Sequence, residues 1–243
     1  MKPSILLCLH GWGGSKESFT ELRNALAGSP LEILTPDLPG FGSEPEPSHP
    51  WTVDDYADWV ESWLRSKLPA DRLPLTVVLG HSHGGRIAIK LAARGTLPIE
   101  HLFLVAAAGI PEKKNLKHVL GLLLAKGGKL LLSIPGLSKM QPAGKKLLYR
   151  LLRVHDYEVA SPVMRTTHQN VTAEDLRPEL AKISIPTDIF WGTEDTMTPF
   201  TNGKEMHRLI RGSKLHIFEG VRHRIHRDRA GEIATVIRQF LPS

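Results

Sequence analysis

Residues 75–85 read LTVVLGHSHGG. The first five are largely apolar, which is typical of a strand buried on both faces of a parallel sheet. The run leads into GHSHG, which matches the pattern G-x-S-x-G, where a sharp turn between a strand and a helix exposes a serine hydroxyl. Only small residues fit on either side of such a turn, and both flanking positions are glycine. The stretch therefore predicts a buried strand, a tight turn at Ser82 and a helix that begins near Gly84.

Strands and helices alternate along most of the chain. Short apolar runs predict five further strands, at residues 5–9, 31–35, 101–105, 187–191 and 214–218. Apolar residues at helical spacing predict helices at residues 17–27, 84–94, 202–210 and near 229–241. A further helix is expected to begin after the N-cap Thr52, and Gly95 is expected to end the helix at 84–94. Six strands alternating with helices predict an α/β fold, with a mostly parallel sheet covered by helices on both faces.

The alternation stops between residues 111 and 179, a segment rich in Lys and Leu and broken by Gly-Gly and Pro-Gly pairs. We expect a helical insertion, or cap, above one edge of the sheet, so that residues 1–110 and 180–243 form the core. Residues 116–132 have the pattern of a basic amphipathic helix. A cap helix with its lysines in solvent is favoured, and contact with an anionic membrane is the alternative.

Composition and charge exclude several classes of protein. The net charge is +6, but residues 111–182 hold 13 Lys and Arg against 6 Asp and Glu, a net of +7, so the remainder is near −1. No nucleic-acid-binding motif accompanies this basic segment, and no nucleic-acid partner is expected. Cys8 is the only cysteine, so no intramolecular disulfide can form. With no recognisable targeting segment and no apolar run of about 20 residues, a cytoplasmic location is expected.

The residues needed to activate Ser82 follow two later strands. A serine hydroxyl becomes a good nucleophile when a base accepts its proton and an acid orients that base. Asp195 comes just after the strand expected at 187–191, and His223 comes after the strand expected at 214–218. The order Ser, acid, His is the one that accompanies this serine turn. We therefore predict that Ser82, Asp195 and His223 form a catalytic triad.

Neighbouring residues leave alternatives open. Glu194 could replace Asp195, because either carboxylate can orient an imidazole, and His226 could replace His223 as the base. If His223 is the base, His226 is expected at the surface or at the rim of the site. Asp37 also ends a strand, but the sequence around it more often shapes a loop. A metal site is conceivable from His216, His223 and His226, but their spacing matches no recognised ligand cluster, so no metal is predicted.

The oxyanion of an acyl-transfer intermediate needs preorganised donors, which are usually backbone N–H groups. One donor is expected from His83, the residue after the nucleophile. The other is expected from the loop HGWGG at residues 10–14, and we assign it to Trp12, with Gly13 as the alternative. Packing beside the turn is favoured over substrate contact for the side chains of His81 and His83. Contact of His83 with the substrate is the alternative. The residues expected to line the substrate site are Gly11, Trp12 and His83.

Five motifs in this order resemble those of a capped α/β-hydrolase. They are HGWGG at 10–14, DLPGFGS at 37–43, GHSHGG at 80–85, WGTED at 191–195 and GVRH at 220–223. The resemblance covers residues 4–110 and about 180–243, and implies a lipase- or esterase-like core without the family's usual first strands and without a cofactor. Two features depart from the family pattern: His83 stands where many relatives carry Met, Gln or Leu, and the cap is unusually basic.

The resemblance implies a serine hydrolase that cleaves a carboxylic ester through a covalent acyl-enzyme. A Leu-rich cap favours a small-molecule substrate with an apolar acyl or alcohol group. The same triad could instead serve a thioesterase, a lactonase, a hydrolase of carbon–carbon bonds or an acyltransferase. A protein of the same fold that binds a ligand without catalysis is a further alternative.

Overall fold

The computed structural model describes residues 4–68, 76–111 and 160–240. Met1–Pro111 and Thr166–Ser243 form one compact unit, and Glu112–Arg165 form a second. Most of the insertion expected at residues 111–179 therefore lies outside the described residues. Residues 166–179, which were expected to belong to it, instead group with the sheet.

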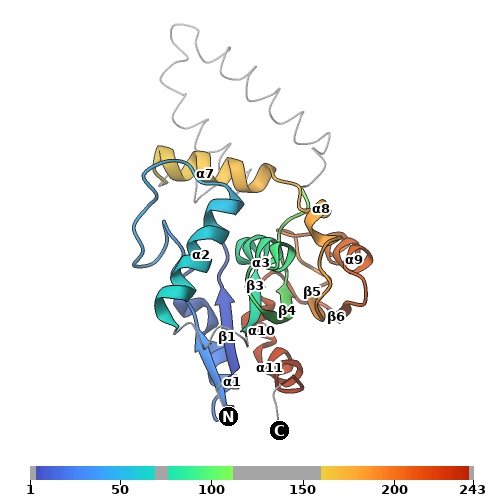
Figure 1. Ribbon diagram of the computed structural model, residues 1–243. Helices are drawn as coiled ribbons and strands as arrows, with labels where there is room; N and C mark the ends of the chain where they lie inside the picture. The colour runs from blue at the N-terminus through green and yellow to red at the C-terminus, as the bar shows by residue number, and fades with distance from the viewer. Residues whose placement is uncertain (1–3, 69–75, 112–159, 241–243) are drawn as a thin grey trace, which may run out of the picture. The chain divides into compact units, whose positions relative to one another are not determined.

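A parallel sheet forms the centre of the first unit (Figure 1). Its described strands are β1 (Ser4–Leu9), β2 (Leu31–Leu34), β3 (Thr76–His81), β4 (Ile99–Val105), β5 (Thr187–Gly192) and β6 (Lys214–Phe218). Their order is β2-β1-β3-β4-β5-β6, and every neighbouring pair is parallel. The six predicted strands and the predicted α/β fold are confirmed, with strand ends shifted by no more than two residues.

Helices cover both faces of this sheet (Figure 1). The described helices are η1 (Lys16–Phe19), α1 (Thr20–Ala25), α2 (Val53–Lys67), α3 (His83–Arg94), α7 (Pro162–Ala173), α8 (Arg177–Leu180), α9 (Phe200–Leu209), α10 (Ile225–Asp228) and α11 (Ala230–Arg238). One face packs against α2, α3, α8 and α9, and the other against α1, α10 and α11. Among these described helices, none is long and apolar enough to cross a membrane.

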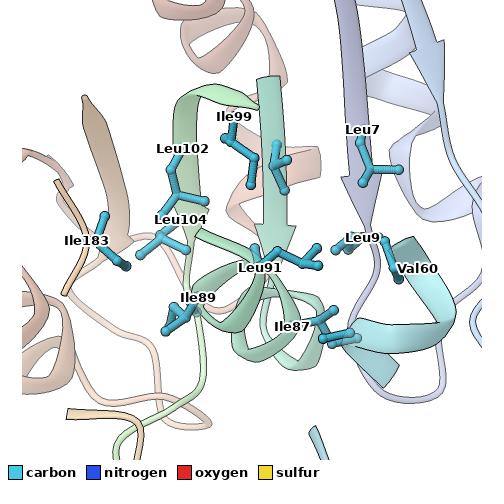
Figure 2. Packing of buried hydrophobic residues seen from close by; sticks show 14 of the residues in the cluster. Leu7, Leu9, Val60, Ile87, Ile89, Leu91, Ile99, Leu102, Leu104 and Ile183 are labelled. Atoms are coloured by element: carbon cyan, nitrogen blue, oxygen red, sulfur yellow. The ribbon is translucent and has the colours of Figure 1, made fainter. Parts of the chain in front are cut away.

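Helix α3 packs into the core on its face of the sheet. Its side chains Ile87, Ile89 and Leu91 are fully buried against the sheet and α2 (Figure 2). The helix ends as predicted at Gly95, whose φ of +64° is a left-handed conformation that favours glycine. The predicted cap of α2 is also present, because the Thr52 side chain accepts a hydrogen bond from the backbone of the third helical residue.

Close packing of α3 on β1 gives a stability test with a matched control. A Cβ on Gly84 would lie 2.0 Å from the Leu9 carbonyl oxygen, whereas a Cβ on Gly231 in α11 would meet no atom within 4 Å. We expect Gly84→Ala to lower the free energy of unfolding by about 3 kcal/mol or more. Gly231→Ala should raise it by roughly 0.5–1 kcal/mol, because alanine is the better helix former. Urea unfolding of both variants measures this, and a similar loss in both would contradict the close contact.

Three strands meet in a histidine–aspartate–histidine cluster around a buried carboxylate. Asp188 of β5 is only 2% exposed; its Oδ2 accepts from His101 Nε2 of β4 at 2.8 Å, and its Oδ1 accepts from His216 Nε2 of β6. Burial by itself raises the pKa of this carboxyl, but the hydrogen bonds and charges of the two histidines lower it to about 2. The cluster joins the edge strand to the middle of the sheet.

The Asp188 cluster predicts an acid limit of stability. The pKa of the Asp188 carboxyl is lower in the folded chain than the ordinary value near 4. The ionised carboxylate therefore stabilises the fold above about pH 4, and this effect is lost as the pH falls towards 2. A shift of this size corresponds to about 2 kcal/mol. In urea unfolding between pH 5 and 2, Asp188→Asn should flatten this part of the stability curve. Parallel curves for the two proteins would refute the prediction.

Candidate active site

The predicted turn at Ser82 lies between the end of β3 and the start of α3. Ser82 has φ +52° and ψ −113°, a conformation that costs a non-glycine residue on the order of 1–3 kcal/mol. Its N–H donates to the Val105 carbonyl at 3.3 Å, and its own carbonyl accepts from the amides of Gly85 and Ala108 at 3.0 and 2.9 Å. A Cβ on Gly80 would lie 2.5 Å from the Gly84 carbonyl oxygen. The surrounding backbone therefore fixes the strained turn.

Asp195 and His223 are brought together from the loops after β5 and β6. His223 Nδ1 lies 2.7 Å from Asp195 Oδ2. The Asp195 side chain is fully buried and also accepts bonds from the Met197 and Thr198 amides and the Thr198 hydroxyl, at 2.8–2.9 Å. Burial raises the pKa of this carboxyl, but the hydrogen bond from His223 and those from Thr198 lower it below its usual value. An ionised Asp195 therefore favours the proton on His223 Nδ1, which leaves the lone pair of Nε2 to accept a hydrogen bond.

Glu194 does not take the place of Asp195. Its side chain is more than half exposed and lies 3.9 Å from Arg222 Nε. Asp37 is likewise occupied elsewhere, because its carboxylate accepts hydrogen bonds from the Lys16 amide and from the amide and hydroxyl of Ser43. It shapes a loop, as the sequence favoured.

The expectation that His226 lies at the surface or the rim is wrong. Its side chain is buried, because the short helix α10 turns it inward against His81, whose ring centroid is 3.8 Å away. Burial, followed by the charges of Arg227, His223 and Arg224, lowers its pKa to about 3, so the ring is neutral near pH 7. Among the described residues, no carboxylate contacts it as Asp195 contacts His223.

The loop at residues 10–14 passes directly over the serine turn. A Cβ on Gly11 would lie 3.2 Å from the Ser82 Cβ and 3.0 Å from His81 Nδ1, which shows why this position is glycine. In the part of the chain that the structure describes, the main-chain N–H groups of Trp12 and His83 donate no hydrogen bond to the protein. The His83 amide is also at the N-terminus of α3, where the helix dipole favours negative charge.

His10 stabilises this loop, a role that the sequence does not reveal. Its Nδ1 bonds to the Gly11 carbonyl at 2.8 Å, which leaves Nε2 to accept from the Leu38 amide at 2.9 Å. The ring thereby joins the loop after β1 to the loop after β2. The partner is 28 positions away in the sequence, so no local pattern indicates the bond.

The His83 side chain packs among aromatic rings. Its ring centroid lies 5.3 Å from that of Trp12 and 4.8 Å from that of Tyr56, and the Trp12 ring lies 4.8 Å from that of His168 in α7. Burial, followed by the charges of Arg86, His10 and His168, lowers the pKa of His83 well below its usual value. His83 is therefore a neutral part of the aromatic packing beside the turn.

The three histidines weighed as a metal site are not gathered. His216 bonds to Asp188, whereas His223 bonds to Asp195 and His226 packs on His81. Within residues 4–68, 76–111 and 160–240, no group of three or more His, Cys, Asp or Glu side chains is arranged to hold a metal ion.

Comparison with known proteins agrees with the α/β fold. The sequence model described as alpha/beta hydrolase fold matches residues 4–230. Lipase 3 of Moraxella sp. is 31% identical over 203 residues, which cover 78% of this chain and 62% of the lipase. A pimeloyl-[acyl-carrier protein] methyl ester esterase of Neisseria meningitidis is 27% identical over 256 residues, covering 96% and 91% of the two chains. An esterase structure from Exiguobacterium antarcticum gives a TM-score of 0.72 at 23% identity, covering 98% of this chain and 91% of that one.

Proposed function

This chain belongs to the alpha/beta hydrolase fold family, and we propose that it is a serine hydrolase that cleaves a carboxylic ester. The observation that carries the proposal is the His223–Asp195 pair, joined at 2.7 Å in the loops that follow β5 and β6. The serine turn follows β3, so all three residues belong to the same edge of a parallel sheet. Relatives named as a lipase and as a methyl ester esterase support an ester as the substrate.

The first half of the proposed reaction forms an acyl-enzyme. Ser82 Oγ attacks the ester carbonyl carbon while His223 Nε2 accepts the hydroxyl proton. The tetrahedral oxyanion accepts hydrogen bonds from the main-chain N–H groups of Trp12 and His83. When the intermediate collapses, the carbon–oxygen bond to the leaving alcohol breaks, and the imidazolium of His223 returns the proton to that alcohol.

The second half releases the acid. A water molecule attacks the acyl carbon while His223 Nε2 takes its proton, and a second oxyanion forms at the same two amides. Collapse breaks the bond to Ser82 Oγ, which regains a proton from His223. Throughout, Asp195 remains ionised, fixes the tautomer of His223 and stabilises its positive charge.

Preorganised donors account for much of the expected rate enhancement. Removing one oxyanion donor from such a site typically costs about 10²–10³-fold in kcat. The two proposed donors belong to segments that are held in place: the His83 amide lies at the first turn of α3, and the Trp12 amide lies in the loop that His10 bonds to the Leu38 amide. Because backbone dipoles are already oriented, no reorganisation is needed when the negative charge develops.

The substrate proposed is a small molecule with an apolar acyl or alcohol group, contacted by Gly11, Trp12 and His83. The insertion expected to cover it lies largely outside the described residues, as does the basic helix for which membrane contact was the less favoured alternative. We propose a cytoplasmic location, because a chain with a single cysteine cannot form an intramolecular disulfide. This cysteine, Cys8, is buried in β1, and burial raises the pKa of its thiol, so the thiol is unreactive.

Steady-state kinetics with matched substrates test this function. We expect the protein to hydrolyse nitrophenyl acetate, butyrate and octanoate, with a burst of nitrophenol when acyl-enzyme breakdown is slow. The thioester and the lactone of comparable chain length serve as comparison substrates. A much higher kcat/KM for either of these would replace ester hydrolysis with the corresponding alternative, and ligand binding without turnover would favour a non-catalytic role.

A further inference from the structure

The loop that carries His223 has to reach across the sheet. It leaves β6, whereas Ser82 follows β3, and the order β3-β4-β5-β6 puts three strand spacings between them. At about 4.8 Å per spacing this is roughly 14 Å. A loop extended over that distance needs contacts at its far end if the imidazole is to stay within hydrogen-bonding reach of a serine hydroxyl.

Two contacts hold the loop from different directions. Asp195, after β5, binds the His223 side chain at Nδ1. His81, the last residue of β3, binds the main chain instead: its Nε2 lies 3.1 Å from the His223 carbonyl oxygen. The first contact sets the rotation and tautomer of the imidazole, and the second sets the position of its backbone.

The His81 ring is itself held in place. It is buried, with its centroid 4.8 Å from the His223 ring and 3.8 Å from the His226 ring. Its Nδ1 faces the position where a Cβ on Gly11 would lie, at 3.0 Å. The His81 imidazole therefore contacts both the loop that carries His223 and the loop at residues 10–14, which holds one of the proposed oxyanion donors. His81 also directly precedes Ser82 in the sequence.

His81 has the protonation state that a donor in this place requires. Burial, followed by the charges of His226 and His223, lowers its pKa well below the usual value, so the ring is neutral. A carbonyl oxygen can only accept, so Nε2 must carry the ring's single proton. A second charged imidazole here would oppose the protonation of His223 during the reaction, and a neutral ring avoids that repulsion.

We propose that His81 is a positioning residue, which places the base by donating its Nε2–H to the His223 carbonyl oxygen. This role rests on the ester hydrolysis proposed above. A displacement of about 1 Å in a catalytic group can cost on the order of 10²-fold in rate. Because His81 does not contact the substrate in this scheme, its loss should lower kcat and leave KM nearly unchanged.

Paired variants separate the hydrogen bond from the packing. In His81→Phe the ring stacking remains but the donor is lost, and we expect kcat on nitrophenyl butyrate to fall about 10- to 100-fold with KM within about twofold. In His81→Gln the side-chain amide supplies a donor at similar reach, and kcat should recover to within about threefold of the wild type. An unchanged kcat in His81→Phe, or a His81→Gln as impaired as His81→Phe, would overturn the proposal.

His101→Phe is the matched control for lost stability. Like His81, His101 is a buried strand histidine that donates from Nε2, but its acceptor is the carboxylate of Asp188. Its replacement should lower the melting temperature and leave kcat unchanged. If it lowers kcat as much as His81→Phe does, the effect of His81 is one of general stability and the proposal fails.

A measurement on the wild-type protein needs no variant. Nitrogen-15 NMR of the imidazoles should show His81 as the neutral Nε2–H tautomer from pH 6 to 9, and the Nδ1–H tautomer would overturn the proposal. Ester hydrolysis by the wild type and by His81→Phe separates the proposed function from the proposed role of His81. A wild type that hydrolyses no ester refutes the proposed function and this role with it. An active wild type with an equally active His81→Phe refutes the role of His81 alone.

Discussion

Replacing Ser82 with alanine is expected to lower ester hydrolysis by roughly 10⁴–10⁶-fold while the protein stays folded. The change removes one oxygen atom and leaves the backbone bonds of the turn intact, since these involve only the Ser82 amide and carbonyl. Without Oγ no acyl-enzyme can form, and only slow attack by water at the oxyanion site remains. The measurement is kcat/KM on nitrophenyl butyrate, with circular dichroism and thermal melting to show that the fold is unchanged.

Ser66→Ala is the matched control for this variant. Ser66 is exposed on α2, where its hydroxyl bonds to the Trp63 carbonyl, and it contacts none of the proposed catalytic residues. It should keep full activity and nearly full stability. If Ser82→Ala retained more than about one hundredth of the wild-type rate, Ser82 would not be the nucleophile.

Replacing His223 with alanine should be about as damaging as replacing Ser82. Base and nucleophile act as a unit, so either loss disables the same step, and the double variant should be little worse than each single one. Such non-additivity is the quantitative signature of a shared function. The comparison requires kcat/KM for both single variants and the double variant under the same conditions.

Arg222→Ala is the control for His223→Ala. Arg222 precedes His223 in the same loop, but its side chain is 83% exposed, so its removal should leave kcat within about twofold. A His223→Ala protein that retained substantial activity would assign the base to another residue. Fully additive losses in the Ser82 and His223 variants would contradict a single unit.

The serine turn and the strands could be predicted from the sequence, because their patterns are local. A buried parallel strand is a short apolar run, and the G-x-S-x-G turn needs glycine where the backbones approach each other. The contact between Leu9 and Gly84 shows the steric reason for one of these glycines. Asp195 and His223 could be placed because each follows such a strand.

The residues that support the site could not be predicted, because their partners are distant in the sequence. His81 and the His223 carbonyl are 142 positions apart, and His10 and the Leu38 amide are 28 apart. The burial of His226 depends on α10, a helix of four residues, which is too short to produce a recognisable period. Spacing alone therefore indicated the residues proposed to react, but not the side chains that hold them in place.

The most direct test of the central hypothesis is labelling with a fluorophosphonate, which phosphonylates an activated serine. Mass spectrometry of the digested wild-type protein should locate a single adduct on Ser82. Ser82→Ala should take up no label, and His223→Ala should react far more slowly than the wild type. An adduct on another residue, or equal labelling of Ser82→Ala, would contradict the assignment of Ser82 as the nucleophile.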